Sequence, residues 1–156
     1  MMAPARAIES PRHLPAGSVQ ERLDQAYGEL GRLLDVAMDA FLLQRESVLR
    51  DWERFAVSLR RWLDCERRVL FPELETLAVP GELGRLEAGH AMLDDALERA
   101  TCLLGLTTRD ELVDAVEELM RTLTAQAVRE RRRFAGRLDE RLDAGARAAL
   151  VERLRF

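Results

Sequence analysis

The sequence predicts an all-α protein, an antiparallel up-down four-helix bundle with a short extra C-terminal helix. Apolar residues recur at helical spacing in four long stretches, and the connections between these stretches are short. Only 5% of the 156 residues are aromatic, which leaves little material for a sheet. The length fits one domain with a sizeable core. Three prolines mark residues 1–17 as a flexible leader, so the bundle is expected to span residues 18–156.

The first two helices are predicted from their starts and apolar stripes. Ser18 and Glu21 have capping-box spacing, so the first helix is expected to begin there. A break near Gln44–Ser47 leads into the second helix, which runs to about Phe71, where Pro72 forces a kink or an end. The stripes are Leu23, Tyr27, Leu30, Leu34, Ala37 and Phe41, then Val48, Trp52, Phe55, Leu59, Trp62, Glu66 and Leu70.

The remaining helices follow from turn and cap signals. A turn at Val79-Pro80-Gly81 precedes the third helix, which Gly105 ends. Thr108 and Glu111 form another capping box at the start of the fourth helix, and Asp143 caps a short terminal helix. Their stripes are Leu83, Leu86, His90, Leu93, Leu97 and Leu104, then Leu112, Val116, Leu119, Leu123, Gln126, Glu130 and Phe134, then Ala146, Leu150 and Leu154.

Two of these stripes contain a carboxylate. Glu66 is the only charged member of the second stripe, and Glu130, 64 residues later, stands in the same Glu-Arg-Arg context. An ionised Glu in a core is costly unless it is paired, hydrogen-bonded or bound to a metal. Iron and manganese accept mixed imidazole and carboxylate ligands, and bundle cores present such ligands from facing helices. The polar set expected inside is Tyr27, Trp62, Glu66, His90, Asp94, Gln126 and Glu130.

With these motifs the chain resembles the hemerythrin-like, or HHE cation-binding, family. In that family the second and fourth helices carry His-x-x-x-Glu, a Leu-Phe-Pro follows the second, and the first and third helices each add a His. Here Leu70-Phe71-Pro72 follows Trp62-x-x-x-Glu66, His90 stands on the third helix, and Gln126-x-x-x-Glu130 makes the fourth contribution. The resemblance covers nearly all of the chain after the leader and implies a metal site within the bundle.

Three residues depart from the family pattern: Tyr27, Trp62 and Gln126 stand where the family has His. Because indole nitrogen only donates a hydrogen bond, we expect the di-iron site to be largely lost. One interpretation keeps a single Fe, Mn or Zn ion on Glu66, His90 and Glu130, with Asp94 or Tyr27 helping.

The other interpretation is metal-free. His90 then pairs with one Glu, Gln126 and Tyr27 donate hydrogen bonds to the other carboxylate, and Trp62 fills the remaining volume. Every buried polar group would be satisfied by the protein itself, and no cofactor would be needed.

The predicted function is therefore a hemerythrin-like protein that binds one cation weakly or none. The alternative is a metal-free helical bundle that acts as a protein-interaction or oligomerisation module, as a homodimer or with a protein partner, through an apolar patch on residues 144–156 or the first helix. No catalytic triad, Cys-His pair or glycine-rich phosphate loop is present, so catalysis is not expected.

Composition and targeting signals restrict the partners and the location. The formal net charge of −4 argues against nucleic acid as a partner. No stretch approaches the roughly 20 apolar residues of a membrane span, so no membrane partner is expected. The first residues lack the apolar block of a signal peptide, and Cys65 and Cys102 stand alone. We expect a cytoplasmic protein.

Overall fold

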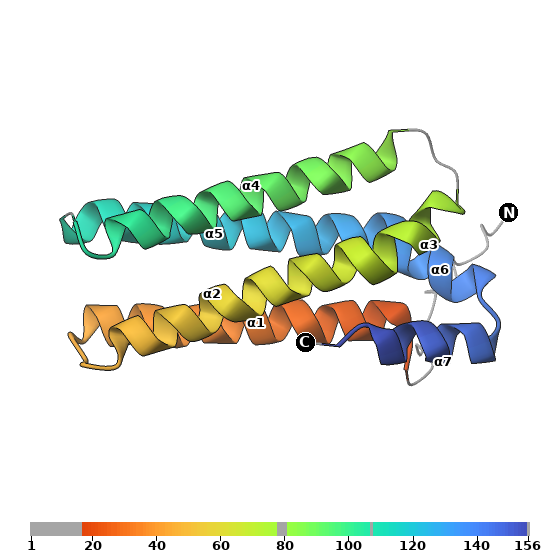
Figure 1. Cartoon of the computed structure of the whole chain (residues 1–156), viewed down its shortest axis with the longest axis horizontal. Coiled ribbons are helices and arrows are strands. Elements are labelled where there is room, and N and C mark those ends of the chain that lie inside the picture. The colour runs from red at the N-terminus through yellow and green to blue at the C-terminus, as the bar shows by residue number, and fades with distance from the viewer. Residues whose placement is uncertain (1–16, 78–80, 107, 156) are drawn as a thin grey trace, which may run out of the picture.

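The computed structural model describes residues 17–77, 81–106 and 108–155, which form helices and no strand (Figure 1). The all-α class predicted from the sequence is confirmed for this part of the chain. The predicted leader lies outside the described residues except for Gly17, as does most of the turn predicted before Gly81. The helices are α1 (Val19–Leu42), α2 (Val48–Cys65), η1 (Glu66–Leu70), α3 (Phe71–Glu75), α4 (Glu82–Leu103), α5 (Arg109–Glu130), η2 (Arg131–Ala135), α6 (Gly136–Arg141) and α7 (Ala144–Arg153).

Two helical hairpins lie side by side along the long axis of the molecule (Figure 1). The first joins α1 to α2 and the second joins α4 to α5; within each hairpin the helices run in opposite directions. The hairpins meet because α1 also packs against α5, and α2 against α4. The continuations α3 and α6 extend the second helix of each hairpin, and α7 turns back beside the start of α1 (Figure 1).

The predicted helix starts agree with the observed N-caps. Ser18 Oγ accepts a 3.0 Å hydrogen bond from the Glu21 N–H, and Asp143 Oδ1 accepts one of 2.7 Å from the Ala146 N–H. Each satisfies one of the backbone donors that a helix start leaves without an intrahelical partner. Thr108 also stands at an N-cap with extended backbone, but within the described structure its side chain makes no capping hydrogen bond.

The second helix of each hairpin, α2 or α5, continues directly into a π-helical turn, and the two π turns lie at the same depth in the bundle. The first is η1, where the Phe71 N–H donates to the Glu66 carbonyl five residues earlier; the second is η2. Pro72 therefore does not end the helix at Phe71, because the wider turn precedes it and regular helix resumes in α3. Single π turns inside α-helices are rare overall, and those that occur are often found at functional sites. Glu66 opens the first π turn, and Glu130 immediately precedes the second.

The turn between α1 and α2 has the hydrogen bonds of a Schellman motif. The Arg45 N–H donates to the Ala40 carbonyl at 2.8 Å, and the Gln44 N–H donates to the Phe41 carbonyl at 3.1 Å. This arrangement places Gln44 in the left-handed region, with φ of 51°. Glycine is the usual residue at this position because a Cβ is unfavourable there.

Leucine dominates the core between the hairpins. The largest fully buried side chains are Trp62, Phe55, Leu23, Leu30, Leu34, Leu59, Leu63, Leu70, Leu86, Leu93, Leu97 and Leu112. Among the described residues, no helix is long and apolar enough to cross a membrane. Besides Ser18, the buried polar or charged residues of this part of the chain are Glu66, His90, Gln126 and Glu130. They mark the place where the apolar core is interrupted.

Candidate metal site

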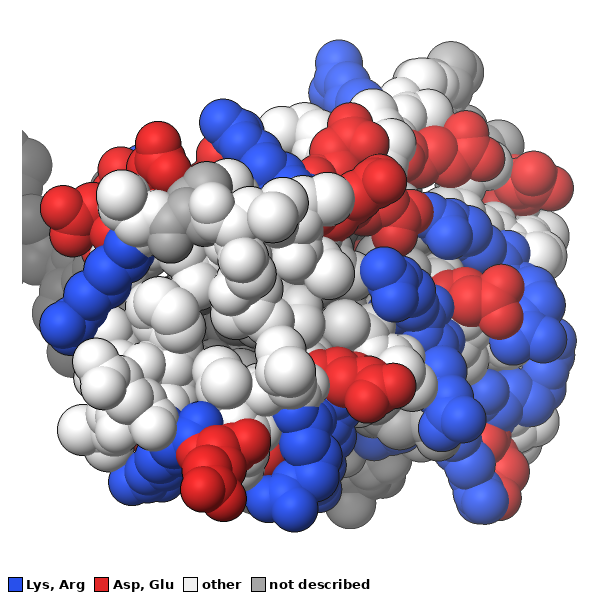
Figure 2. All heavy atoms as spheres, turned by 60° about the vertical axis from the view of Figure 1, so that its left-hand side comes forward, with Lys and Arg blue, Asp and Glu red and all other residues white. Residues whose placement is uncertain are grey.

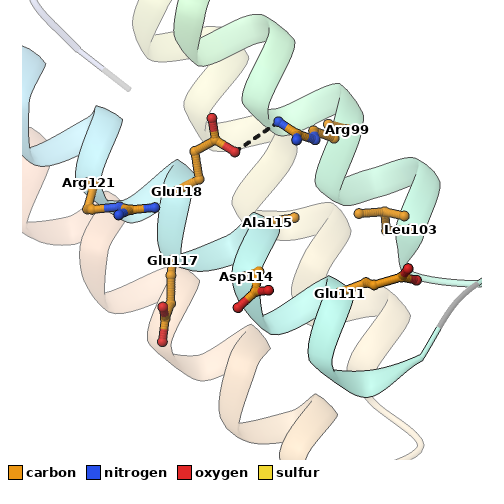
Figure 3. Close-up of a pocket in the computed structure, with 8 residues that line it drawn as sticks. All are labelled: Arg99, Leu103, Glu111, Asp114, Ala115, Glu117, Glu118 and Arg121. Atoms are coloured by element: carbon orange, nitrogen blue, oxygen red, sulfur yellow. Dashed lines mark hydrogen bonds and ion pairs between the residues drawn. The ribbon is translucent and has the colours of Figure 1, made fainter.

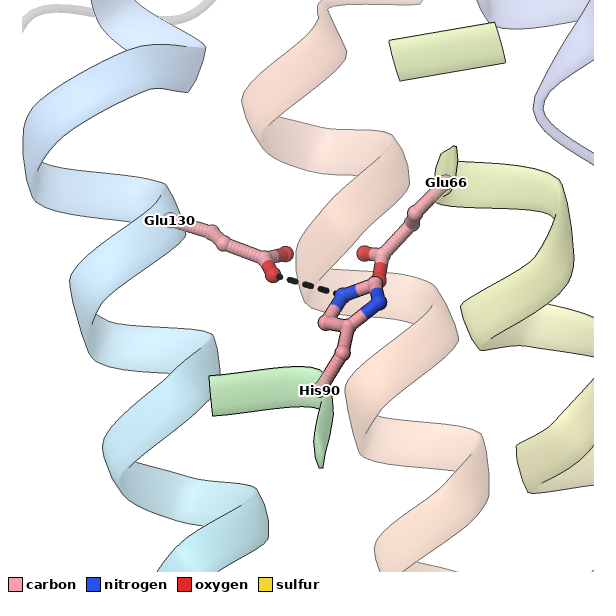
Figure 4. A group of neighbouring side chains, drawn as sticks. All are labelled: Glu66, His90 and Glu130. Carbon is pink, nitrogen blue, oxygen red and sulfur yellow. Dashed lines mark ion pairs between the residues drawn. The ribbon is translucent and has the colours of Figure 1, made fainter. Parts of the chain in front are cut away.

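Three buried side chains form a compact cluster in the core: Glu66 from η1, His90 from α4 and Glu130 from α5 (Figure 4). Each offers one nitrogen or oxygen atom, and these three atoms lie within 4.8 Å of one another. All three side chains are 0% exposed. The apolar stripes predicted from the sequence explain this placement, because each residue occupies an inward position of its own helix.

The imidazole of His90 lies between the two carboxylates (Figure 4). Its Nε2 is 2.9 Å from Glu66 Oε2 and 3.6 Å from Glu130 Oε1. The shorter contact lacks the direction of a hydrogen bond and the longer one exceeds hydrogen-bond length, so within the described structure both His90 ring nitrogens and Glu66 Oε1 lack a hydrogen-bond partner. A buried polar atom without a partner costs about 1–3 kcal/mol. These atoms therefore retain the capacity to ligate an ion.

The oxygens of Glu130 are already used by two donors. The Tyr27 hydroxyl lies 3.0 Å from Glu130 Oε2 and 3.3 Å from Glu66 Oε2, so it bridges the two carboxylates. Gln126 Nε2 donates to Glu130 Oε1 at 2.6 Å. These two donors are the ones that the metal-free interpretation of the sequence names.

Two neighbours, Arg129 and Gly89, fix the orientation of the Gln126 side chain. Arg129 Nη1 donates to Gln126 Oε1 at 3.1 Å, which fixes the amide with its nitrogen toward Glu130. Gly89 leaves the space that this orientation needs, since a Cβ built there would lie 1.9 Å from Gln126 Oε1. The hydrogen bonds thus continue from a half-buried arginine at the surface to the buried carboxylate.

Trp62 fills the volume beside Tyr27. Its side chain is 0% exposed, and its ring meets the phenol ring edge-on, with centroids 6.1 Å apart and an interplanar angle of 83°. The Arg22 guanidinium lies 5.9 Å from the indole centroid, within the range of a cation–π contact. This position is therefore occupied by a packed aromatic ring rather than by a side chain that could ligate a metal.

Asp94 lies apart from the cluster. Its Oδ2 is 2.7 Å from Arg67 Nη2, and both side chains are 43% exposed. Four helical residues rotate a side chain by about 400°, so Asp94 lies some 40° off the direction of His90. The arginine on the neighbouring element then holds it at the surface.

Burial and mutual repulsion govern the acid groups of the cluster. Removal from water raises the pKa of Glu66 well above its ordinary value, and the charge of Glu130 raises it further. Burial likewise raises the pKa of Tyr27, with smaller contributions from Glu130 and Glu66. Two adjacent buried carboxylates are stabilised by anything that brings positive charge between them, either a proton or a metal ion.

Some supporting features have little or no signal in the sequence. Phe71 packs against the His90 ring, with centroids 4.8 Å apart and planes inclined by 40°. The two π turns leave no recognisable mark, although the repeated Glu-Arg-Arg indicates that the two segments are equivalent. Gly89, directly before His90, is a signal that could have been noticed, since a glycine within a helix often marks a close approach.

Outside the core, a surface hollow of about 620 Å³ lies between α4 and α5 (Figure 3). It is lined by Arg99, Leu103, Glu111, Asp114, Ala115, Glu117, Glu118 and Arg121. The Arg99–Glu118 ion pair, with a separation of 2.9 Å, crosses it. Its charged groups are exposed to water, so they lack the desolvation that makes the buried cluster chemically distinctive.

No protein-family model, curated protein or solved structure matches this chain. The geometry alone therefore indicates what the site can do. Of the five ligand candidates in the sequence, Glu66, His90 and Glu130 meet, Tyr27 bridges the carboxylates, and Asp94 is bound to Arg67.

Proposed function

We propose that the protein is a hemerythrin-like antiparallel four-helix bundle, with α7 as the extra helix, that binds one divalent transition-metal ion through Glu66, His90 and Glu130. The observation that supports this most strongly is the approach of three fully buried ligand atoms to within 4.8 Å. Both nitrogens of His90 and one oxygen of Glu66 have no hydrogen-bond partner in the described structure. A cation would satisfy such atoms and would neutralise the paired carboxylates.

The donor set favours iron, manganese or zinc. One imidazole and two carboxylates are acceptable to all three metals, and water can complete the shell. A single iron or manganese ion would supply one-electron chemistry, whereas zinc would supply charge and stability. We therefore infer that the protein stores or senses a metal ion, or responds to the redox state of that ion.

The residues present do not fit a di-iron centre. Trp62 cannot ligate a metal, and its buried ring packs edge-on against Tyr27. Gln126 offers only a neutral amide, which already donates to Glu130 at 2.6 Å. We therefore derive no oxygen-carrying chemistry from the resemblance.

Metal analysis tests the proposal directly. Protein expressed with iron and manganese supplements, and apoprotein titrated anaerobically with Fe(II), Mn(II) and Zn(II), should bind about one equivalent of one metal. His90→Ala and Glu130→Gln should each weaken that binding by about tenfold or more, because each removes a ligand. The matched control is His13→Ala, which changes the other histidine of the chain and should leave the stoichiometry unchanged.

Less than about a tenth of an equivalent of every metal in the wild-type protein would rule out the cation site. A bound metal that survives both His90→Ala and Glu130→Gln would place it elsewhere. Circular dichroism of each variant must show the helical spectrum of the wild type, so that loss of binding reports loss of ligands.

A metal-free interaction module is the second candidate, and the hydrogen bonds at Glu130 favour it. Tyr27 and Gln126 together satisfy both oxygens of this carboxylate without an ion. In this case the cluster would serve to fix the register of the helices. Thermal stability unchanged by EDTA, iron or zinc, together with self-association, would support the module over the metal site.

A further inference from the structure

Phe71 borders both the buried cluster and a hollow at the surface. Its ring packs against the His90 ring with centroids 4.8 Å apart, and the residue is 5% exposed. The hollow, of about 410 Å³, is lined by Arg67, Phe71, Pro72, Glu75, Leu83 and Glu87. We call it the Phe71 hollow. One aromatic side chain is therefore shared by the wall of this hollow and by the surroundings of the candidate ligand His90.

An exposed ion pair lies beside the ring contact. Arg67 Nη2 is 2.7 Å from Asp94 Oδ2, and both side chains are 43% exposed. Arg67 precedes Phe71 by four residues and Asp94 follows His90 by four. The ion pair and the ring contact therefore join the same two segments about one turn apart. Because Arg67 also lines the Phe71 hollow, the pair holds η1 against α4 at the edge of that hollow.

The charges of the Phe71 hollow favour a cation. Glu75 and Glu87 are exposed, and among the described residues neither carboxylate has a basic group within ion-pair distance. No arginine stands three or four residues from either of them, where a helical partner would be. Arg67 is the one base of the lining, and its charge is already matched by Asp94. The two carboxylates thus leave an excess of negative charge at the hollow.

Two other sides of the cluster are closed by groups that have firm contacts of their own. Trp62 is fully buried and packs edge-on against Tyr27, and Gln126 is hydrogen-bonded at both ends of its amide. Phe71 instead stands at the start of α3, a helix of five residues that directly follows the π turn η1. Helices this short gain little from their own hydrogen bonds, so α3 opens locally more easily than the long helices on the other sides.

The surface at the end where both hairpins turn has a different character. Figure 2 shows this side of the molecule, where a broad pale area of uncharged residues is bordered by charged side chains. Leu43, Leu49 and Leu106 are exposed at these turns, and apolar groups do not attract an ion. The terminal segment, where the sequence predicted an apolar patch, has Leu150 and Leu154 buried. We therefore expect a cation to approach the cluster from the end of the molecule that carries α3 (Figure 1).

We propose that the Phe71 hollow is the entrance through which a divalent cation reaches the buried cluster. Phe71 is its movable cover, and the Arg67–Asp94 pair is the latch that limits the movement of this cover. The inference rests on the proposed metal site. A latch outside the cluster does not touch the bound ion, so it changes the barrier to entry and to exit equally. It therefore sets the rates of binding and release and leaves the affinity nearly unchanged.

Rates of metal binding test the entrance. Arg67→Gln/Asp94→Asn, the latch variant, removes the ion pair without changing the net charge. Zn(II) should then bind and leave about two- to fivefold faster than in the wild type, as expected from the loss of one exposed ion pair, with the affinity within about twofold. Stopped-flow competition with a chromophoric chelator measures both rates. Arg99→Gln/Glu118→Gln, the control variant, removes another exposed ion pair, between α4 and α5, and should leave both rates unchanged.

Chemical access to His90 gives a second reading that needs no metal. Diethyl pyrocarbonate acylates an imidazole nitrogen that it can reach, and in a His13→Ala background His90 is the only histidine of the chain. In EDTA, His90 of the latch variant should be acylated about two- to fivefold faster than in this background, as measured by mass spectrometry. The control variant should react at the rate of the background. Both variants lose one exposed ion pair, so a general loss of stability would speed the two reactions alike.

The possible failures separate the entrance from the metal site. Unchanged rates in the latch variant, with about one equivalent of metal still bound, would overturn the entrance and leave the metal site standing. Equal acceleration in the control variant would also overturn the entrance, because the rates would then follow stability rather than local opening. Less than about a tenth of an equivalent of metal in the wild type would overturn the metal site and, with it, the route for a cation.

Discussion

Gly89 of α4 and Gln126 of α5 approach so closely that a Cβ on the glycine would lie 1.9 Å from Oε1 of the glutamine. The same glutamine donates to Glu130 Oε1 at 2.6 Å, so the close approach of its side chain to the backbone of α4 helps to set the position of a buried carboxylate. The glycine thus acts on the polar cluster without belonging to it.

The first prediction concerns this contact. Gly89→Ala should displace Gln126 and lower the free energy of unfolding by about 1–3 kcal/mol, because crowding is added and a buried hydrogen bond is lost. Urea unfolding measures the change. Gly84→Ala in the same helix is the control: no atom lies within 4 Å of its added Cβ, so helix propensity should stabilise the protein by up to about 1 kcal/mol. Equal effects of the two variants would contradict the proposed role of Gly89.

The second prediction concerns pH. Burial, followed by the charge of Glu130, raises the pKa of Glu66 in the folded protein. Neutral Glu66 therefore contributes stability that is fully present below the unfolded pKa and is lost as pH rises through the folded pKa. Glu66→Gln should raise the stability of metal-free protein at pH 8 by about 1 kcal/mol or more, with little effect near pH 4.

Urea unfolding in EDTA across this pH range measures that difference. Glu53→Gln on the exposed face of α2 is the control and should change stability by less than about 0.5 kcal/mol at either pH. Destabilisation by Glu66→Gln at pH 8 would show that the ionised carboxylate is well compensated in the metal-free fold.

The third prediction concerns two histidines added beside the cluster, at positions where the hemerythrin-like pattern has them. Trp62→His/Gln126→His should increase the iron bound per chain and should produce an absorbance band in the near ultraviolet, since both side chains are buried beside the cluster. Arg61→His/Ala125→His shifts the new histidines by one residue onto exposed positions and should have neither effect. No gain from the buried pair would argue against the hemerythrin-like arrangement.

The fourth prediction concerns the α1–α2 turn. Gln44 has φ of 51°, which costs a residue with a Cβ about 1–2 kcal/mol. Gln44→Gly should therefore raise the melting temperature. Ser47→Gly, at a position with φ of −76°, should lower it instead, because only the added chain entropy then matters. Thermal denaturation followed by circular dichroism decides between these signs.

Much of the interior could be predicted from the sequence, because helical periodicity alone places Glu66 among Leu59, Trp62 and Leu70. The same rule put Asp94 inside, one turn after His90, whereas its side chain is 43% exposed at the surface. Its actual position depends on Arg67, which approaches from another element at 2.7 Å. Such a partner has no fixed spacing in the chain, so no pattern of residues could reveal it.

The π turns were beyond sequence reasoning for a related reason. Pro72 indicates that the backbone is disturbed, but the wide turn begins at Glu66. A propensity rule identifies the residue that disrupts the helix. It does not say in which of the preceding turns the helix widens to accommodate that residue. The packing of Phe71 against His90 is one tertiary contact that favours a wide turn at residues 66–70 over a wide turn elsewhere in the helix.

Each π turn contains one residue more than an α-helical turn would hold. Removing a single arginine from η1 or η2 would therefore let the segment rewind as ordinary α-helix while the residues downstream keep nearly the same orientation. Phe71 and Leu74 would stay in the interior in one case, and Leu138 in the other. If the turn rewound with all its residues kept, the same side chains would instead rotate by about 100°, so the wide turn is what lets the apolar pattern shift by one position after the carboxylate and still face the core.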